Sequence, residues 1–231
     1  MVRVREEDRM LRFTQSNRAT KLVAATFGVL VGLAGIDHGV FEILQGNVVP
    51  ENTMIAAIGP AQRFWEYGVE TAFTKVPNFL VSGILSVILG LAVVVWAGWF
   101  LHRRYAAGVL LLLAVALFLV GGGFAPIFMS LLASLVASRI HKPLKVWRTL
   151  LPGTVGRFLA RLWPGVLVTF VVVFVVSVEI AIFGWPLTIF FSPATAFDLL
   201  NMISYVMLGL MLFAPLTGFA HDIQAVRIKE M

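Results

Sequence analysis

The apolar positions of this chain fall into long runs, which polar and basic connections separate. A run of about 20 apolar residues is long enough for a helix that crosses a bilayer. Four runs reach that length, at residues 22–45, 78–101, 164–183 and 199–220. The pattern therefore predicts an all-α protein that folds as a polytopic helical membrane bundle.

A fifth run, residues 105–140, is too long for one ordinary span. Its middle is interrupted by Gly121–Gly123 and Pro126, residues that break helices. We expect a helical hairpin with arms at about 105–121 and 124–140, which brings the number of spans to six. Each arm of about 15 to 17 residues would reach roughly 23 to 26 Å, less than a hydrocarbon core of about 30 Å. The glycine apex would then lie sunken and admit water, or the hairpin would tilt and thin the bilayer.

The positions of Lys and Arg predict the orientation of the six spans. With both termini cytoplasmic, 18 Lys and Arg residues divide so that only Arg63 and Lys75 lie outside. The positive-inside rule favours this arrangement. Five spans would instead place the basic connection 139–163 outside. We therefore predict a multi-pass protein of the cell membrane, with residues 1–21 as a short surface helix on the cytoplasmic leaflet.

Two connections carry patterns of their own. Residues 60–73 begin with a proline and are rich in aromatic residues, which predicts an interfacial helix on the outer side. The basic connection 139–163 mixes cations with apolar anchors beside a span. This mixture is typical of segments that bind anionic lipids at a membrane surface rather than nucleic acid.

Composition agrees with one integral membrane domain over residues 1–231. Hydrophobic residues make up 59% of the chain, charged residues 13%, and the net charge is +6. The mean hydropathy of +0.92 excludes an ordinary soluble domain. The absence of cysteine excludes disulfides, thiolate metal sites and iron–sulfur clusters. No nucleotide-binding loop or hydrolase motif occurs, so nothing in the sequence identifies an enzyme.

The first span is unusual because it carries Asp37, His38 and Glu42 among apolar residues. A charged group at the centre of a membrane helix costs on the order of 2.5–3.5 kcal/mol, so such residues usually face a partner or a cavity. On a helical wheel, His38 and Glu42 border a stripe of small residues suited to close helix packing, and Asp37 lies on the other side. The stripe consists of Gly28, Gly32, Gly35 and Gly39.

Six acids and one amide fall on the predicted outer side, where only two cations accompany them. They are Asp37, Glu42, Glu66, Glu70, Glu179, Asp198 and Asn201. Mutual repulsion would favour the binding of a cation or a proton if these groups meet. His38 and Glu42 could also begin a site for a divalent metal such as zinc or manganese. The alternative is structural, with His38 and Glu42 joined by a hydrogen bond that pins the helix.

Three functions stay open on these observations. The first is the handling of a small cation, proton or small solute through an outward-facing acidic pocket. The second is a non-catalytic membrane subunit or scaffold of a larger complex, either with a membrane partner subunit or as a homo-oligomer. The third is a metal-dependent membrane enzyme that acts on a lipid-like substrate. No cofactor other than a divalent metal is indicated.

Overall fold

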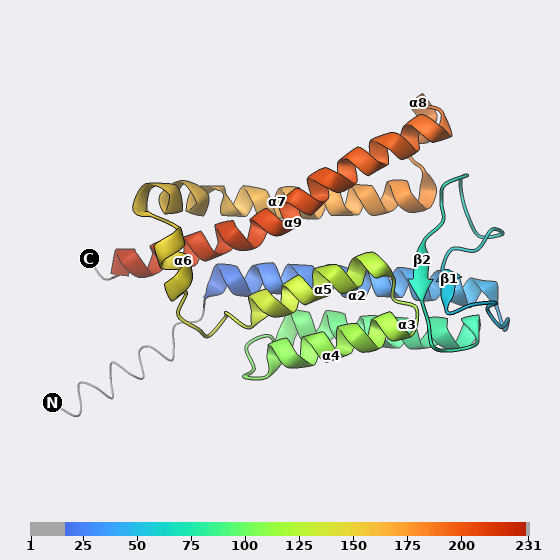
Figure 1. Ribbon diagram of the computed structural model, residues 1–231, viewed down its shortest axis with the longest axis horizontal. Coiled ribbons are helices and arrows are strands. Elements are labelled where there is room, and N and C mark those ends of the chain that lie inside the picture. Colours follow the sequence, from blue (N-terminus) through green and yellow to red (C-terminus); the bar gives the residue numbers. More distant parts are fainter. Residues whose placement is uncertain (1–16, 230–231) are drawn as a thin grey trace.

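A computed structural model describes residues 17–229, and Figure 1 shows the arrangement of its elements. The surface helix predicted for residues 1–21 falls almost entirely outside this range. The helices are α2 (Arg18–Gln45), α3 (Phe79–Val95), α4 (Ala106–Leu119), α5 (Phe124–Ala137), α6 (Lys145–Leu150), α7 (Gly153–Phe183), α8 (Leu187–Phe190) and α9 (Pro193–Lys229). α3 continues into one π-helical turn, Trp96–Phe100. Two short antiparallel strands, β1 (Met54–Ala56) and β2 (Thr71–Phe73), form a hairpin.

The helices form two layers (Figure 1). α7 and α9 pack along each other in one layer, and α2 to α5 form the other. One end of the molecule holds α6, which we call the α6 end, and the opposite end holds the β-hairpin. Within residues 17–229, four helices are long and apolar enough to cross a membrane: α2, α3 with its π-helical turn, α7 and α9. Together with the two shorter apolar helices α4 and α5, they support a helical membrane bundle.

α2 is the central helix of the bundle. Its most apolar window is 56% buried, against 28% for α3 and for α7 and 11% for α9. The main hydrophobic cluster surrounds its first half, where Phe27 packs against Phe170 of α7 with ring centroids 4.8 Å apart. The other helices of the bundle therefore pack around α2.

Glycines bring α2 and α3 into backbone contact. A Cβ added to Gly32 would lie 2.6 Å from the carbonyl oxygen of Gly90, and one added to Gly90 would lie 2.7 Å from that of Gly32. Gly39 and Gly83 approach each other in the same reciprocal way, at 2.6 and 2.5 Å. Any larger residue would separate the helices, since in lipid close packing is what holds them together.

The α4–α5 hairpin turns at Gly121–Gly123, where the sequence predicts it. Gly121 and Gly123 have φ angles of +114° and +83°, a region that L side chains rarely adopt. Each arm is a helix of 14 residues, a little shorter than predicted. The turn contacts α2, because a Cβ on Gly121 would collide with the carboxyl group of Glu42.

The prediction of an interfacial helix at residues 60–73 is wrong. The structure has turns there, followed by β2. Gly68 interrupts the segment, and its aromatic residues do not share one helical face. Trp65 instead donates a hydrogen bond from Nε1 to the carbonyl oxygen of Ala181 in α7, 3.0 Å away. The segment therefore lies across the ends of the helices, where side chains such as Trp65 form hydrogen bonds with them.

Two helices extend well beyond the spans predicted within them. α7 begins at Gly153 rather than at Pro164, which lies inside the helix. α9 extends from Pro193 to Lys229, well beyond the predicted 199–220. As a result, the basic connection 139–163 is partly helical, since it contains α6 and the first turns of α7. Hydropathy locates the apolar middle of a helix, whereas these helices continue into polar sequence at their ends.

Candidate ligand-binding site

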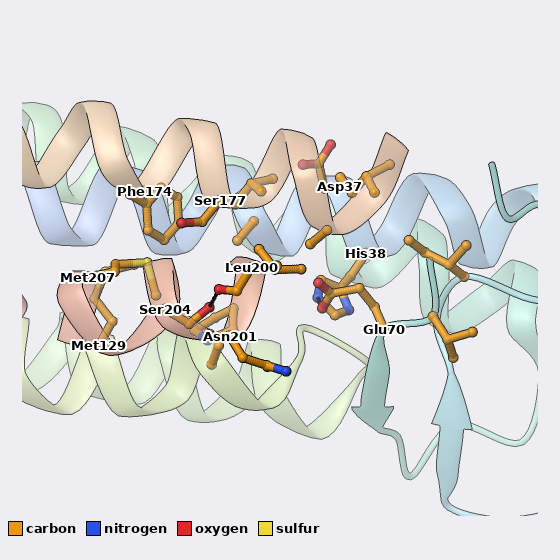
Figure 2. Close-up of a pocket in the computed structure, with 18 of the residues that line it drawn as sticks. Asp37, His38, Glu70, Met129, Phe174, Ser177, Leu200, Asn201, Ser204 and Met207 are labelled. Atoms are coloured by element: carbon orange, nitrogen blue, oxygen red, sulfur yellow. Dashed lines mark hydrogen bonds and ion pairs between the residues drawn. The ribbon is translucent and has the colours of Figure 1, made fainter. Parts of the chain in front are cut away.

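A cavity of about 300 Å³ lies between the two layers, near the β-hairpin end. Its walls come from α2, α5, α7 and α9, and the loop that precedes β2 closes one side. Figure 2 shows that polar and apolar side chains line different parts of it. The cavity is therefore amphipathic, with a polar end close to the loop.

The polar end is built around an ion pair between a helix and the loop. His38 Nε2 lies 3.2 Å from Glu70 Oε2, and the two side chains stand together in Figure 2. Glu70 is held in place because its carbonyl oxygen accepts a hydrogen bond of 2.7 Å from the backbone N–H of Ala57. Asp37 also lines the cavity and is half-buried. One carboxylate thus pairs with the imidazole, and a second, that of Asp37, also lines the cavity.

Hydroxyl and amide groups from the other layer extend this polar end. Ser177 of α7 and Asn201 and Ser204 of α9 line the cavity. The hydroxyls of Ser177 and Ser204 donate hydrogen bonds to the carbonyl oxygens of Val173 and Leu200 in the preceding turn. Their oxygens therefore keep lone pairs that can accept a hydrogen bond from a guest.

The rest of the cavity is apolar. Aromatic residues and methionines line it, with Met129, Phe174 and Met207 visible at the far side in Figure 2. Phe170 lies deeper, against α2. Methionine side chains are flexible and polarizable, so such a wall can adapt to guests of different shape.

Glu42 lies behind the cavity, not in it. Its side chain is fully buried, and Ser82 of α3 donates a hydrogen bond to its Oε2. Its Oε1 has no hydrogen-bond partner among the described residues and lies against Gly121. His38 lies under the same turn, since a Cβ on Gly123 would come within 2.6 Å of its ring. The glycine turn therefore covers both His38 and Glu42.

The predicted site residues separate into two groups. The structure brings together Asp37, His38, Glu70 and Asn201. The others do not line the cavity: Glu42 is buried behind it, and Glu66, Glu179 and Asp198 are exposed. The predicted alternative of a His38–Glu42 hydrogen bond is replaced by separate partners, Glu70 for the imidazole and Ser82 for the carboxyl group.

No metal centre is assembled by the residues that the structure describes. Among residues 17–229, no group of three or more His, Cys, Asp and Glu side chains is placed to hold a metal ion. Divalent zinc or manganese normally takes four or more ligands, so the His38–Glu70 pair alone is a weak start for such a site.

Sequence reasoning missed several residues of this region. Ser82 and Ser86 were one detectable signal, because they lie one turn apart in an apolar run and share a face with Gly83 and Gly90. Ser86 donates a hydrogen bond to the carbonyl oxygen of Val120, next to the glycine turn. Ser177 was the other signal, as the single serine within a valine-rich span.

Fold and site together define a helical bundle, suited to a membrane, that encloses an amphipathic cavity with an acidic end. Comparison with known protein families, curated proteins and solved structures finds no match to this chain. The chemistry of the cavity is therefore the guide to the function.

Proposed function

We propose that this protein binds a small amphipathic organic cation and carries it across or out of the membrane. One observation supports this proposal above the others: the cavity of about 300 Å³ joins two carboxylates to an apolar interior. Ligand pockets for small molecules have this design, with a mostly apolar lining and a few polar groups that fix orientation. The cation would lie beside Asp37 and Glu70, and the apolar body among the methionines and phenylalanines.

The charge balance of the polar end favours a cationic guest. Two carboxyl groups, those of Asp37 and Glu70, line this end against the single imidazole of His38, so its ionisable groups are mainly acidic. Tyr67 and Phe197, stacked with ring centroids 4.6 Å apart, also line the cavity. Aromatic rings stabilise a nearby ammonium group by roughly 0.5–2 kcal/mol. A bare metal ion would use the carboxylates but would gain nothing from the apolar walls.

The membrane arrangement is part of this proposal. We infer six spans in the cell membrane, with α4 and α5 as short spans and both termini cytoplasmic. The distribution of Lys and Arg supports this topology. The β-hairpin end, and with it the acidic end of the cavity, would then face outward.

Binding of three related probes to the purified protein tests the proposal. 4-Phenylbutylamine, 4-phenylbutanol and 4-phenylbutyrate share an apolar body but carry a cation, a neutral group and an anion. We expect the amine to bind at least about tenfold more tightly than the acid, because a hydrogen bond to a charged group contributes about 1.5–3 kcal/mol. Isothermal titration calorimetry measures the three affinities, and uptake of labelled amine into proteoliposomes tests transport.

Variants localise the effect to the cavity. Asp37→Asn and Glu70→Gln should each weaken amine binding about tenfold, on the same energetic argument. Glu66→Gln removes an exposed carboxylate from the same loop and should leave the affinity unchanged. Equal binding of the amine and the acid, or no binding of the amine to the wild type, would refute the proposal.

A scaffold role is the second candidate, and the surface of α9 favours it. Only 11% of its apolar window is buried, and Tyr205 and Met202 are 75% and 64% exposed. Either lipid or a partner subunit could cover this face. A partner recovered in stoichiometric amount in mild detergent, together with no binding of the amine, would establish the scaffold role. The metal-dependent enzyme has no comparable support among the described residues.

A further inference from the structure

A second, smaller cavity lies at the α6 end and differs in charge from the first. It has a volume of about 250 Å³ and is lined by the turn after α5, the start of α6 and the last turns of α9. Its basic lining residues are His141, Lys142, Lys145 and Arg148. Leu144 and Ile223, both buried, also line it.

The single acid that lines this cavity is already hydrogen-bonded to groups of α2. Asp222 of α9 accepts hydrogen bonds from the backbone N–H groups of Ala19 and Thr20 and from the Thr20 hydroxyl, at 3.0, 2.8 and 2.7 Å. These N–H groups belong to the first turn of α2, where the helix dipole is positive. The carboxylate of Asp222 therefore balances the positive end of the α2 helix dipole. The positive charge of the two lysines remains available to a ligand in the cavity.

The walls of the cavity are held in place by backbone contacts. Asn17 Nδ2 donates hydrogen bonds to the carbonyl oxygens of Arg139 and Lys142, at 2.8 and 3.0 Å. His141 donates from Nε2 to the carbonyl oxygen of His102, 3.1 Å away, which ties this turn to the α3–α4 connection. The lysines thus project from a fixed turn, which favours a defined site over a diffuse basic surface.

The surroundings of the cavity are suited to a membrane surface. Val146 and Leu150 of α6 are 68% and 62% exposed, as is Phe158 of α7 at 62%. Cations beside exposed apolar side chains are typical of segments that lie in the headgroup region with their apolar groups in the acyl layer. Lys and Arg together are the usual ligands of phosphate.

We propose that this α6-end cavity is a binding site for a phosphate-bearing anion, supplied as the headgroup of an anionic phospholipid or as a soluble organic phosphate. Lys142 and Lys145 contact the phosphate oxygens, and Arg148 contributes to the positive field. The proposal concerns the end of the molecule opposite the organic-cation cavity and does not depend on the function proposed for that cavity.

Native mass spectrometry of the purified full-length protein tests the site, with equal amounts of phosphatidylglycerol and phosphatidylcholine that carry the same acyl chains. We expect wild type to retain phosphatidylglycerol at least about fivefold over phosphatidylcholine. The double variant Lys142→Gln with Lys145→Gln should lose this preference. The control Arg157→Gln with Arg161→Gln removes two exposed cations of α7 that do not line the cavity, and it should keep the preference.

A parallel measurement distinguishes the two sources of phosphate. If sn-glycerol 3-phosphate alone raises the melting temperature of wild type but not of the lysine variant, the site takes soluble phosphates. If only the lipid binds, the site is a headgroup site. A lysine variant with wild-type lipid preference, or equal losses in the lysine variant and the α7 control, would overturn the proposal.

A comparison at a single position keeps the proposal testable if the double variant misfolds. Should the double variant fail to stay monodisperse, Lys145→Gln and Lys145→Arg replace one exposed residue at the start of α6. The arginine variant should keep the preference for phosphatidylglycerol, and the glutamine variant should lose at least half of it. Equal preference in both would also contradict the site.

Discussion

Glu42 illustrates how the surroundings of a residue determine whether its shape, its hydrogen bonds or its charge matters most. Its side chain is fully buried in the centre of the bundle, held by Ser82 on one side and covered by Gly121 on the other. Ser82 Oγ also lies 3.1 Å from the carbonyl oxygen of Phe79, so one hydroxyl hydrogen serves two acceptors. An uncompensated charge in such a place is costly, which makes shape and hydrogen bonding more important here than charge.

We expect Glu42→Gln to retain most of the stability of the protein and Glu42→Ala to lose much more. The amide keeps the shape and can still accept the hydrogen bond from Ser82, whereas alanine leaves a cavity that typically costs about 2–5 kcal/mol. Thermal unfolding in detergent measures both. If glutamine destabilises the protein as much as alanine, the negative charge itself is required and our interpretation of this residue is wrong.

The sequence points to the polar residues of α2 but not to their partners. Asp37, His38 and Glu42 stand out because the residues around them are apolar, and the helical period sets their relative directions. The partner of His38 is Glu70, which comes from a loop whose structure the pattern predicts wrongly. The partner of Glu42 is Ser82, an ordinary residue in an apolar run. Such partners depend on tertiary contacts between distant segments, which periodicity does not encode.

At the scale of elements, the α2–α3 pair depends on the absence of side chains. Gly32 faces Gly90, and Gly39 faces Gly83, so each backbone lies against the carbonyl group of the other. Neither helix could come this close with a Cβ at these positions. The same contact sets the position of Ser82 and hence the surroundings of Glu42.

Gly90→Ala should therefore destabilise the protein although alanine favours helices. The new Cβ would lie 2.7 Å from the carbonyl oxygen of Gly32, and overpacking of this kind typically costs about 1–3 kcal/mol. Gly209→Ala in α9 is the control, since its Cβ would enter open space. Chemical unfolding in mixed detergent measures both. A Gly90→Ala variant as stable as the control would mean that the helices can separate without loss.

Hydropathy predicts the middles of these helices well and their ends poorly. The apolar runs lead to α2, α3 and the α4–α5 hairpin, with the turn placed correctly by its glycines. α7 and α9 begin earlier or end later than their apolar runs because helix formation continues wherever the backbone can bond to itself. The segment before β2 has aromatic residues suited to an interface, yet Gly59 and Gly68 and the contacts of Trp65 favour turns.

At the scale of the whole molecule, Asp222 joins the two layers at the α6 end. Its carboxylate satisfies N–H groups in the first turn of α2, a role that a residue next to the helix usually has. Asn17, the residue before α2, uses its side chain to bind the turn after α5 instead. The start of the central helix therefore depends on both neighbouring segments.

Asp222→Ala should destabilise the protein by about 1–3 kcal/mol, because buried N–H groups of α2 would lose their acceptor. Asp198→Ala, an exposed acid on the same helix, provides the control and should change the stability little. Hydrogen exchange at Ala19 and Thr20 should rise in the first variant alone. Unchanged exchange at these two amides would show that another group takes over the contact.

This contact also bears on the order in which the chain matures. Ala19 and Asp222 are 203 residues apart, and α2 leaves the ribosome long before α9 is made. The N–H groups in the first turn of α2 therefore lack this acceptor until residue 222 has been synthesised. A chain that stops short of residue 222 can build most of its helices but cannot close the end of its central one. A chain truncated before residue 222 should therefore be cleaved more readily at the start of α2 than a chain that includes Asp222.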